Sequence, residues 1–439
     1  MSSAENLAET GPETAFAVRW SSLVLLFLAI LTDGFDTAAF SFVVPVLGRE
    51  WGRTPAEFTP ALVATNVGVV VGYLVCSKLT ARWGRRAVVW SAVAFFSVSV
   101  LTTALAGSVA VLTVIRFVTG VGLGAVLPAA VSLGATCVPV LRRGSAAIGV
   151  TLGISAGGTV SGLVGGAMIA HLGWQSVFWL PGVLSMGLAV LLWWKLVRPE
   201  AQVSQAQAPA ASAETEAAQP VRDYSGVRSL LSRGLAGRTA LLWGFSFLAL
   251  GCGYIIQSWL PTLLVQAGYR AGQVSFGTAA FSFGALVAGV LLVIVTARWG
   301  IPRVIAILCG LGVVCLGVFA STSPSFSGAL VLSVLIGIGT GAATKGQSAI
   351  AVLTYPENCH TAGVAWSAAL GRVGSIAGPG LVGLLLSLHV SVSGILSVTT
   401  FLLAGAGVLV VPFIRLTRRS PRHQAIQAAP AEREQTPAE

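Results

Sequence analysis

Long apolar runs alternate with short polar connections along almost the whole chain. A helix that crosses a membrane needs about 20 mostly apolar residues, and by that rule the pattern predicts twelve spans. They are centred in 20–47, 59–80, 87–106, 109–136, 146–170, 177–196, 238–264, 274–296, 304–320, 328–353, 364–387 and 392–414. We therefore expect an all-α membrane protein with twelve transmembrane helices.

The strongest break in this pattern lies at 198–236, which contains "AQVSQAQAPAASAETEAAQP". Such a composition buries too little apolar surface to fold alone, so we expect a disordered or loosely helical linker. The linker separates two predicted six-helix bundles, 19–197 and 237–415. Polar tails at 1–18 and 416–439 flank them, and the first lacks the basic region of a cleaved signal peptide.

The two predicted bundles also share a short repeat. "ARWGRRAV" at 81–88 follows the second span, and "ARWGIPRV" at 297–304 follows the eighth. Parallel repeats of six spans build one large class of secondary transporters, whose substrate site lies between the halves near the middle of the membrane. The sequence therefore predicts two similar halves with a site between them.

Composition supports the membrane assignment and excludes a nucleic-acid binder. The chain is 55% hydrophobic and only 9% charged, whereas soluble domains carry about 25% charged residues. Its net charge of +11 comes from short basic clusters between apolar runs, such as "LRRG" at 141–144. A nucleic-acid binder instead gathers Lys and Arg on one face with polar and aromatic neighbours.

The basic residues also predict the topology. With both termini in the cytoplasm, only Arg49, Arg53 and Arg270 fall on the outer side, and most other Lys and Arg fall on the cytoplasmic side. This bias is the positive-inside pattern. We expect a multi-pass protein of the cytoplasmic (inner) membrane with both termini and the linker inside the cell.

Two aspartates stand out because they are the acidic residues that fall within a predicted span. Asp33 and Asp36 lie in the first span, although the chain has fifteen acidic residues. A charge at the centre of a membrane helix costs about 2.5–3.5 kcal/mol, so each needs water, a cation or a proton. Spaced i, i+3 they share one helix face, and close like charges favour a protonated carboxyl. We expect them to carry a coupling proton; a structural ion pair with Arg116 or Arg372 is the alternative, and both can hold.

Three basic residues also lie within predicted spans. Arg116 begins "RFVTGVGLG" of the fourth span, and must be paired or hydrated unless it snorkels to the outer interface. Arg372 lies near mid-membrane in the eleventh span and is the candidate for a substrate carboxylate, which guanidinium binds bidentately. Lys345 of the tenth span is a second anion contact, a partner of an aspartate, or a lysine that snorkels inward.

Aromatic side chains near these charges are candidates for a pocket that holds a flat, apolar cargo. Phe35 lies between the two aspartates, and Trp366 lies one and a half turns before Arg372. Interfacial belt positions are the alternative for most tryptophans. No nucleotide loop, metal-ligand spacing or Ser-His-Asp arrangement is present in the sequence, so we expect no cofactor, no metal and no enzymatic activity.

Five segments of the chain resemble one family in order. They are "DGFDTAAFSFVVPVL", "RFVTGVGLGAVLPAA", "GWQSVF", "SWLPTLLVQAG" and "YPENCHTAGVAWSAALGRVGSIAGP". Together they are similar to the aromatic acid/proton symporters of the major facilitator superfamily, over essentially all of 20–415. The resemblance implies uptake of a benzoate-like acid with a proton. It places Asp33 and Asp36 at the family's first-span acids, and Arg116 and Arg372 at its fourth- and eleventh-span arginines.

The family's loop after the second span usually carries an acid, and here that loop reads "SKLTARWGRR". Ala81 stands at the acidic position, and Ala297 stands at the matching position of the repeat. Basic residues remain in both copies, and the resemblance makes them candidates for a conformational gate. These candidates are Arg82, Arg85, Arg86 and Arg298.

We therefore expect a monomeric, proton-coupled transporter in the lipid bilayer that imports an aromatic or related organic carboxylic acid by alternating access. Drug or metabolite efflux by the same fold is an alternative. The fifth span, "GISAGGTVSGLVGG", lacks the Gly-Pro pair of many antiporters, which disfavours efflux. A sensor that binds aromatic acids without moving them is a further alternative, but it needs a sizeable signalling domain, and the longest soluble stretch is the linker.

Overall fold

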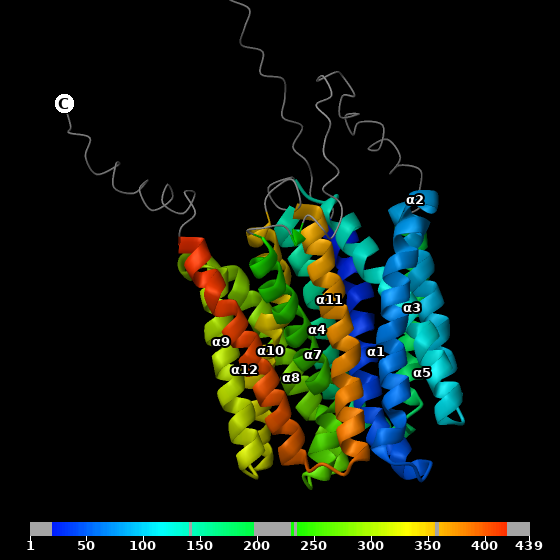
Figure 1. Cartoon of the computed structure of the whole chain (residues 1–439). Helices are drawn as coiled ribbons and strands as arrows, with labels where there is room; N and C mark the ends of the chain where they lie inside the picture. Colours follow the sequence, from blue (N-terminus) through cyan, green and yellow to red (C-terminus); the bar gives the residue numbers. More distant parts are fainter. Residues whose placement is uncertain (1–19, 140–142, 197–229, 232–234, 356–359, 419–439) are drawn as a thin grey trace, which may run out of the picture.

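The computed structural model describes residues 20–139, 143–196, 230–231, 235–355 and 360–418. In this part of the chain the regular elements are helices, most of them long, and they run side by side in one bundle (Figure 1). Their bounds are α1 Trp20–Glu50, the 3-10 helix η1 Pro55–Phe58, α2 Thr59–Thr103, α3 Val109–Ala135, α4 Arg143–Leu172, α5 Ser176–Leu196, α7 Ala236–Gln266, α8 Ala271–Trp299, α9 Ile301–Ser321, α10 Phe326–Thr354, α11 His360–Ser387 and α12 Val392–Arg418.

Helix α2 contains two of the predicted spans. It has 45 residues, which at about 1.5 Å per residue is twice the roughly 30 Å of a bilayer core. Gly84 interrupts it with φ 80° and ψ 157°, so two helical rods meet there at a kink. The described residues hold 11 continuous helical segments long and apolar enough to cross a membrane. The segment that contains α2 holds two spans, one on each side of Gly84, so the 11 segments correspond to the twelve spans that the sequence predicts.

The short sequence repeat has the same backbone conformation in both halves. Gly84 ends "ARWG" in α2, and Gly300 ends the second "ARWG" between α8 and α9, with φ 80° and 79°. This left-handed region favours glycine, since other residues clash there. Each glycine thus reverses the chain between two consecutive spans. We call this side of the bundle the Gly84 end and the opposite side the η1 end.

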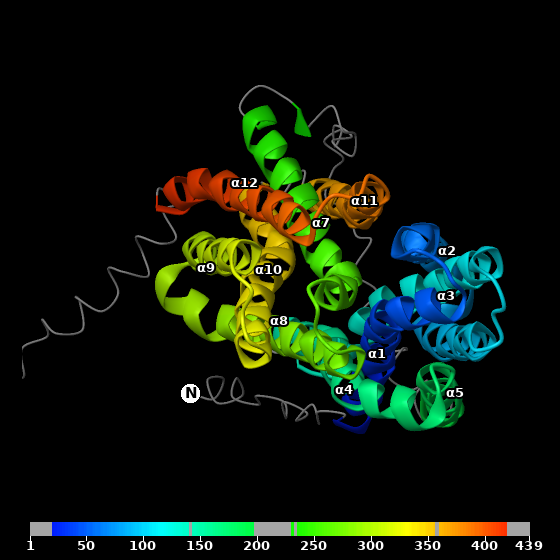
Figure 2. The same ribbon diagram turned by 90° about the horizontal axis from the view of Figure 1, so that it is seen from below.

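The helices form two groups that meet along the middle of the bundle (Figure 2). The first half is α1–α5 and the second half is α7–α12. They meet where α4 packs on α8, α1 on α7, and α2 on α11. The predicted tail 1–18, and most of the predicted linker 198–236 and tail 416–439, lie outside the described residues.

Small residues bring the halves closest toward the η1 end. Gly162 of α4 lies so near α8 that an added Cβ would come within 2.4 Å of the backbone nitrogen of Ala279. One turn further on, a Cβ on Gly166 would come within 2.4 Å of the Ser275 hydroxyl. Glycine permits this approach because helices in lipid associate through close backbone packing.

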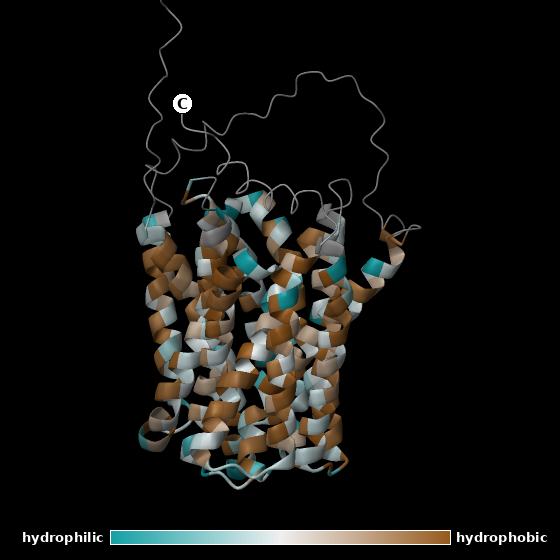
Figure 3. Cartoon of the chain, turned by 90° about the vertical axis from the view of Figure 1, so that its left-hand side faces the viewer, coloured by the Kyte–Doolittle hydropathy of each residue, from teal (hydrophilic) through white to brown (hydrophobic). Residues whose placement is uncertain are grey.

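The outer surface fits a lipid environment. Brown, apolar residues dominate the length of the helices, and the teal, polar ones gather mainly at the two ends (Figure 3). At the η1 end, Trp51 stacks on Phe58 with ring centroids 5.9 Å apart and meets Trp174 edge-on at 6.3 Å. This aromatic cluster packs the ends of α1 and η1 against the start of α5.

Candidate functional site

A cavity lies between the two halves, and six helices from both of them line it. The lining includes an aspartate, two arginines and two tyrosines beside apolar side chains. Its polar residues are Asp33, Thr37, Thr65, Asn66, Tyr73, Arg116, Tyr254, Gln257, Ser258 and Arg372. Its apolar residues are Phe40, Leu62, Val69, Leu123, Leu127 and Ile154.

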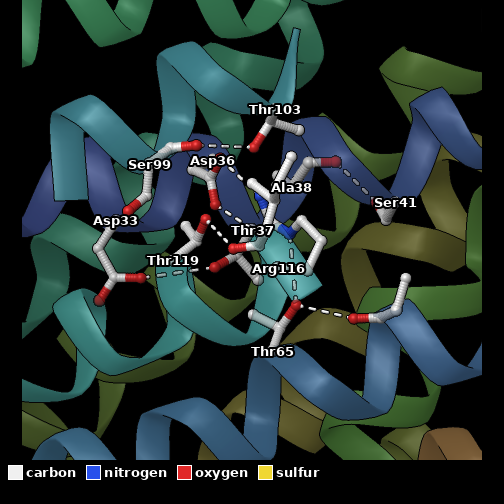
Figure 4. A network of polar contacts seen from close by, with 12 residues as sticks. Asp33, Asp36, Thr37, Ala38, Ser41, Thr65, Ser99, Thr103, Arg116 and Thr119 are labelled. Atoms are coloured by element: carbon white, nitrogen blue, oxygen red, sulfur yellow. Dashed lines mark hydrogen bonds and ion pairs between the residues drawn. The ribbon is translucent and has the colours of Figure 1, made fainter. Parts of the chain in front are cut away.

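The most buried polar contact at this cavity is an ion pair within the first half. Arg116 donates from both terminal nitrogens to Asp36, at 3.0 Å and 2.7 Å, and from Nε to the Thr65 hydroxyl at 3.3 Å (Figure 4). The Phe40 ring lies 4.4 Å from the centre of the guanidinium. Arg116 is 0% exposed and Asp36 2%. The structural ion pair that the sequence left open is therefore present, and Asp36 forms it.

Asp33 has a different environment although it lies one turn away. Its carboxylate lines the cavity and accepts a hydrogen bond from the Thr37 hydroxyl at 3.4 Å. In Figure 4 the dashed line from Asp33 joins it to Thr37, whereas the dashed lines from Arg116 run to Asp36 and Thr65. Among the described residues, no basic nitrogen lies within 4.0 Å of this carboxylate. Asp33 is thus a carboxylate at the cavity wall that no neighbouring cation neutralises by direct contact.

Arg372 is the basic residue that the second half presents to the cavity. It donates to the Tyr254 hydroxyl at 3.1 Å and to the Tyr73 hydroxyl at 2.7 Å. The Tyr73 ring also lies 4.7 Å from its guanidinium carbon. No carboxylate of the described residues lies within 4.0 Å. Neutral hydroxyls hold this cation, so an anion that enters the cavity can bind it.

Lys345 lies at another junction of the halves and does not line this cavity. Its ammonium donates to the Ser155 hydroxyl of α4 at 3.2 Å, and its methylene groups pass beside Gly289 of α8. Like Arg372, it crosses from the second half to a neutral hydroxyl acceptor of the first half. Its place in the fold favours a contact between helices over a direct contact with the contents of the cavity.

The two aromatic candidates also lie away from the cavity. Phe35 is 7% exposed and packs in the hydrophobic core. The helical period explains this, because Asp33, Thr37 and Phe40 share the cavity face whereas a residue two positions after Asp33 points nearly the opposite way. Trp366 is 40% exposed and lies beside Trp243, with ring centroids 6.1 Å apart.

The basic residues considered for a gate lie at the Gly84 end. Arg82 and Arg85 are exposed on either side of the α2 kink, and Arg298 is exposed at the end of α8. Arg86 is half-buried and has interactions of its own. The repeat thus places Arg82 and Arg298 at corresponding positions of the two halves, whereas Ile301 and Pro302 stand where the first copy has Arg85 and Arg86.

A family model described as the Major Facilitator Superfamily matches residues 26–277 and 267–437. The chain belongs to the major facilitator superfamily. It is 32% identical over 388 residues to a gallate transporter of Pseudomonas putida, covering 85% of this chain and 86% of that protein. It is 31% identical over 392 residues to a 4-hydroxybenzoate transporter of Pseudomonas aeruginosa, covering 84% and 87%. These relatives confirm the predicted family of aromatic acid transporters.

A solved structure confirms the predicted fold of this major facilitator chain. A crystal structure of a bacterial homologue of the human lysosomal transporter Spinster, inward-facing and unoccupied, aligns with a TM-score of 0.68. The alignment covers 93% of this chain and 98% of that one, at 16% identity. Both chains therefore share one fold.

Sequence reasoning missed the two tyrosines of this major facilitator site. Tyr73 and Tyr254 hold Arg372 from opposite halves, yet neither lies in a charged motif. A weak signal existed, because the chain has only five tyrosines and membrane proteins usually place tyrosine at the interfaces. Both of these lie well inside long helices, Tyr73 in the first rod of α2 and Tyr254 in the middle of α7.

Proposed function

We propose that this chain imports an aromatic or related organic carboxylic acid together with protons, by alternating access of its two halves. One observation carries the proposal. The same cavity presents Asp33 from the first half and Arg372 from the second, and neither has an ion-pair partner among the described residues. An acid and its coupling proton need such groups, one to bind the anion and one to take the proton.

The guanidinium of Arg372 binds the carboxylate of the cargo. A charged hydrogen bond contributes about 1.5–3 kcal/mol, and the planar group matches a carboxylate in shape. Apolar residues such as Phe40, Leu62 and Val69 supply the surface for an aromatic ring. The names of the relatives, a gallate and a 4-hydroxybenzoate transporter, support an aromatic acid as the cargo.

The carboxyl of Asp33 carries the coupling proton. A carboxyl with no cation in contact can take up and release a proton without breaking an ion pair, and water that enters the cavity gives the proton a path. Asp36 and Arg116 neutralise each other one turn away, so the proton and the salt bridge occupy separate sites. The buried pair holds α1 against α3 while the proton moves at Asp33.

Proton coupling also has an energetic reason. An anion that enters a cell with a negative interior works against about 2.3 kcal/mol per charge per 100 mV. Transport of more than one proton with each monoanion makes uptake electrically favourable. In this arrangement the Gly84 end faces the cytoplasm of a bacterial inner membrane, both termini lie inside, and one monomer is the transport unit.

Uptake by proteoliposomes tests the function. Purified protein in vesicles with an acidic exterior is expected to accumulate radiolabelled 4-hydroxybenzoate or gallate above the external concentration, and a protonophore is expected to abolish accumulation. The neutral 4-hydroxybenzamide serves as a control and is expected to compete poorly. Export that rises with the same gradient, or binding without any flux, would contradict import.

A further inference from the structure

Arg372 is held across the interface between the halves, which distinguishes it from the buried cation of the first half. Arg372 belongs to α11, and its Nη2 donates to Tyr73 of α2 at 2.7 Å. Its Nη1 donates to Tyr254 of α7, in its own half, at 3.1 Å. The two acceptors are chemically identical, and they differ in the half to which they belong.

Each tyrosine retains one hydrogen bond to donate. A phenolic hydroxyl accepts through its oxygen and donates through its hydrogen, and the oxygen of each accepts from Arg372. A carboxylate bound beside the guanidinium therefore lies within reach of both O–H groups. The cavity that would hold it is lined by all three residues.

We propose that Tyr73 is the residue that makes binding of an aryl carboxylate draw the two halves together. The carboxylate accepts from Arg372 on one side and from the Tyr73 hydroxyl on the other, so the bound acid joins α11 to α2. Tyr254 binds the same carboxylate but joins it only to the second half. This inference rests on the proposed function and assigns the closing step of that function to one hydroxyl.

The nature of the contacts fits this role. In the contact between Arg372 and Tyr73 only the arginine is charged. The Tyr73 ring also lies 4.7 Å from the guanidinium carbon. This contact can open without leaving a buried carboxylate unpaired. Breaking the Asp36–Arg116 pair would instead leave a buried charge without its partner. Contacts between the halves must open and reform in every transport cycle.

The test compares Tyr73→Phe with its matched control Tyr254→Phe. Each variant removes one hydroxyl and keeps the ring, so each is expected to weaken binding of 4-hydroxybenzoate by a similar factor of about three to ten. Tyr73→Phe is also expected to lower the maximal uptake rate at least tenfold, whereas Tyr254→Phe changes mainly the apparent KM. Thermal unfolding of both variants checks that the fold is kept.

Closure is measured directly between spin labels at Trp83→Cys in α2 and Trp299→Cys in α8. Both tryptophans are more than half exposed at the Gly84 end. The five cysteines of the described residues are buried, and Cys359 is replaced by serine. Added 4-hydroxybenzoate is expected to change the label distance in wild type and in Tyr254→Phe but not in Tyr73→Phe. Tyr73→His, which keeps a ring donor, is expected to recover part of the change.

The outcomes separate this inference from the function on which it rests. If both phenylalanine variants respond as wild type does, or both lose the response equally, the role of Tyr73 is overturned while the transport function stands. If wild type neither binds the acid nor transports it, the proposed function is overturned and the inference with it.

Discussion

The buried cations in the two halves of this transporter have different kinds of partner. In the first half, Arg116 is matched by a carboxylate of the same half in a bidentate pair, with both residues almost fully buried. In the second half, the hydrogen-bond acceptors of Arg372 and Lys345 among the described residues are neutral hydroxyl groups, those of Tyr73, Tyr254 and Ser155. The first arrangement neutralises a charge permanently, and the second leaves a cation able to exchange its partner.

The type of partner depends on whether the contact lies within one half or crosses between the halves. The pair of Asp36 and Arg116 joins helices that stay together when the halves move, so it need never open. Arg372 and Lys345 both reach across to helices of the first half, where a full salt bridge would resist separation. A buried ion pair that loses one partner costs about 3–5 kcal/mol, whereas a hydrogen bond to a hydroxyl costs far less to exchange. We infer that the moving contacts use hydroxyls for this reason.

The strongest way to break the comparison is to remove the permanent pair. Arg116→Leu leaves the carboxylate of Asp36 buried without a cation, and we expect a loss of about 3–5 kcal/mol in the free energy of unfolding. Thermal unfolding in detergent, together with the yield of folded protein, measures it. The double variant Asp36→Asn/Arg116→Leu is the control and should recover much of that stability, because no charge is stranded. A single variant as stable as wild type would contradict a stabilising role for this pair.

The next largest effect concerns Asp33, whose carboxylate contacts no cation among the described residues. Asp33→Asn removes the proton site and leaves Asp36 and Arg116 paired, so we expect normal stability and substrate exchange but no accumulation above the external concentration. Uptake driven by a pH gradient and counterflow without a gradient measure the two properties. Asp36→Asn is the matched control, and it should lower stability as well. Normal accumulation by Asp33→Asn would refute the proton role.

Arg372 offers an intermediate effect. Arg372→Ala is expected to weaken binding of 4-hydroxybenzoate roughly ten- to hundredfold, since a charged hydrogen bond contributes about 1.5–3 kcal/mol. Binding of the neutral 4-hydroxybenzamide should change much less. Equilibrium binding of both ligands by the same purified variant measures the ratio, and equal losses would indicate that Arg372 only shapes the cavity.

The smallest effect is expected at the second hydroxyl-held cation. Lys345→Gln keeps a donor for Ser155 and removes the charge, and we expect a change of about two- to fivefold in uptake rate. Ser155→Ala is the partner variant, and similar changes in both would show that the contact acts as one unit. If Lys345 instead binds a second anionic group of the substrate, Lys345→Gln will alter the preference between mono- and dicarboxylic acids and Ser155→Ala will not. Competition assays measure this preference.

Much of the fold was predictable from local features. The apolar runs identify every span, because a helix of about 20 apolar residues has the length and composition that cross the bilayer core. The repeated "ARWG" marked corresponding turns, and Gly84 and Gly300 indeed share one backbone conformation. The second and third predicted spans remain separate rods within α2, since Gly84 with φ 80° divides them.

The site was predictable in part, for an equally physical reason. A charge inside a span is rare and costly, so Asp33, Arg116 and Arg372 were visible as candidates without a structure. Phe35 and Trp366 are candidates from the sequence because they lie close to the charged residues along the chain. In the structure Phe35 points away from the cavity, because it lies two helical positions after Asp33. Lys345 was visible too, although its partner Ser155 lies 190 positions away.

The sequence by itself determined the number of spans, the two-fold repeat and which charges lie within the membrane, because each depends on composition along one helix. Only the tertiary structure decided that Asp36 pairs with Arg116, that no cation of the described residues contacts Asp33, and that tyrosines from opposite halves hold Arg372. Those choices depend on how helices far apart in the chain rotate and pack against one another. No local pattern records that rotation, which is set by close contacts such as that of Gly162 with α8.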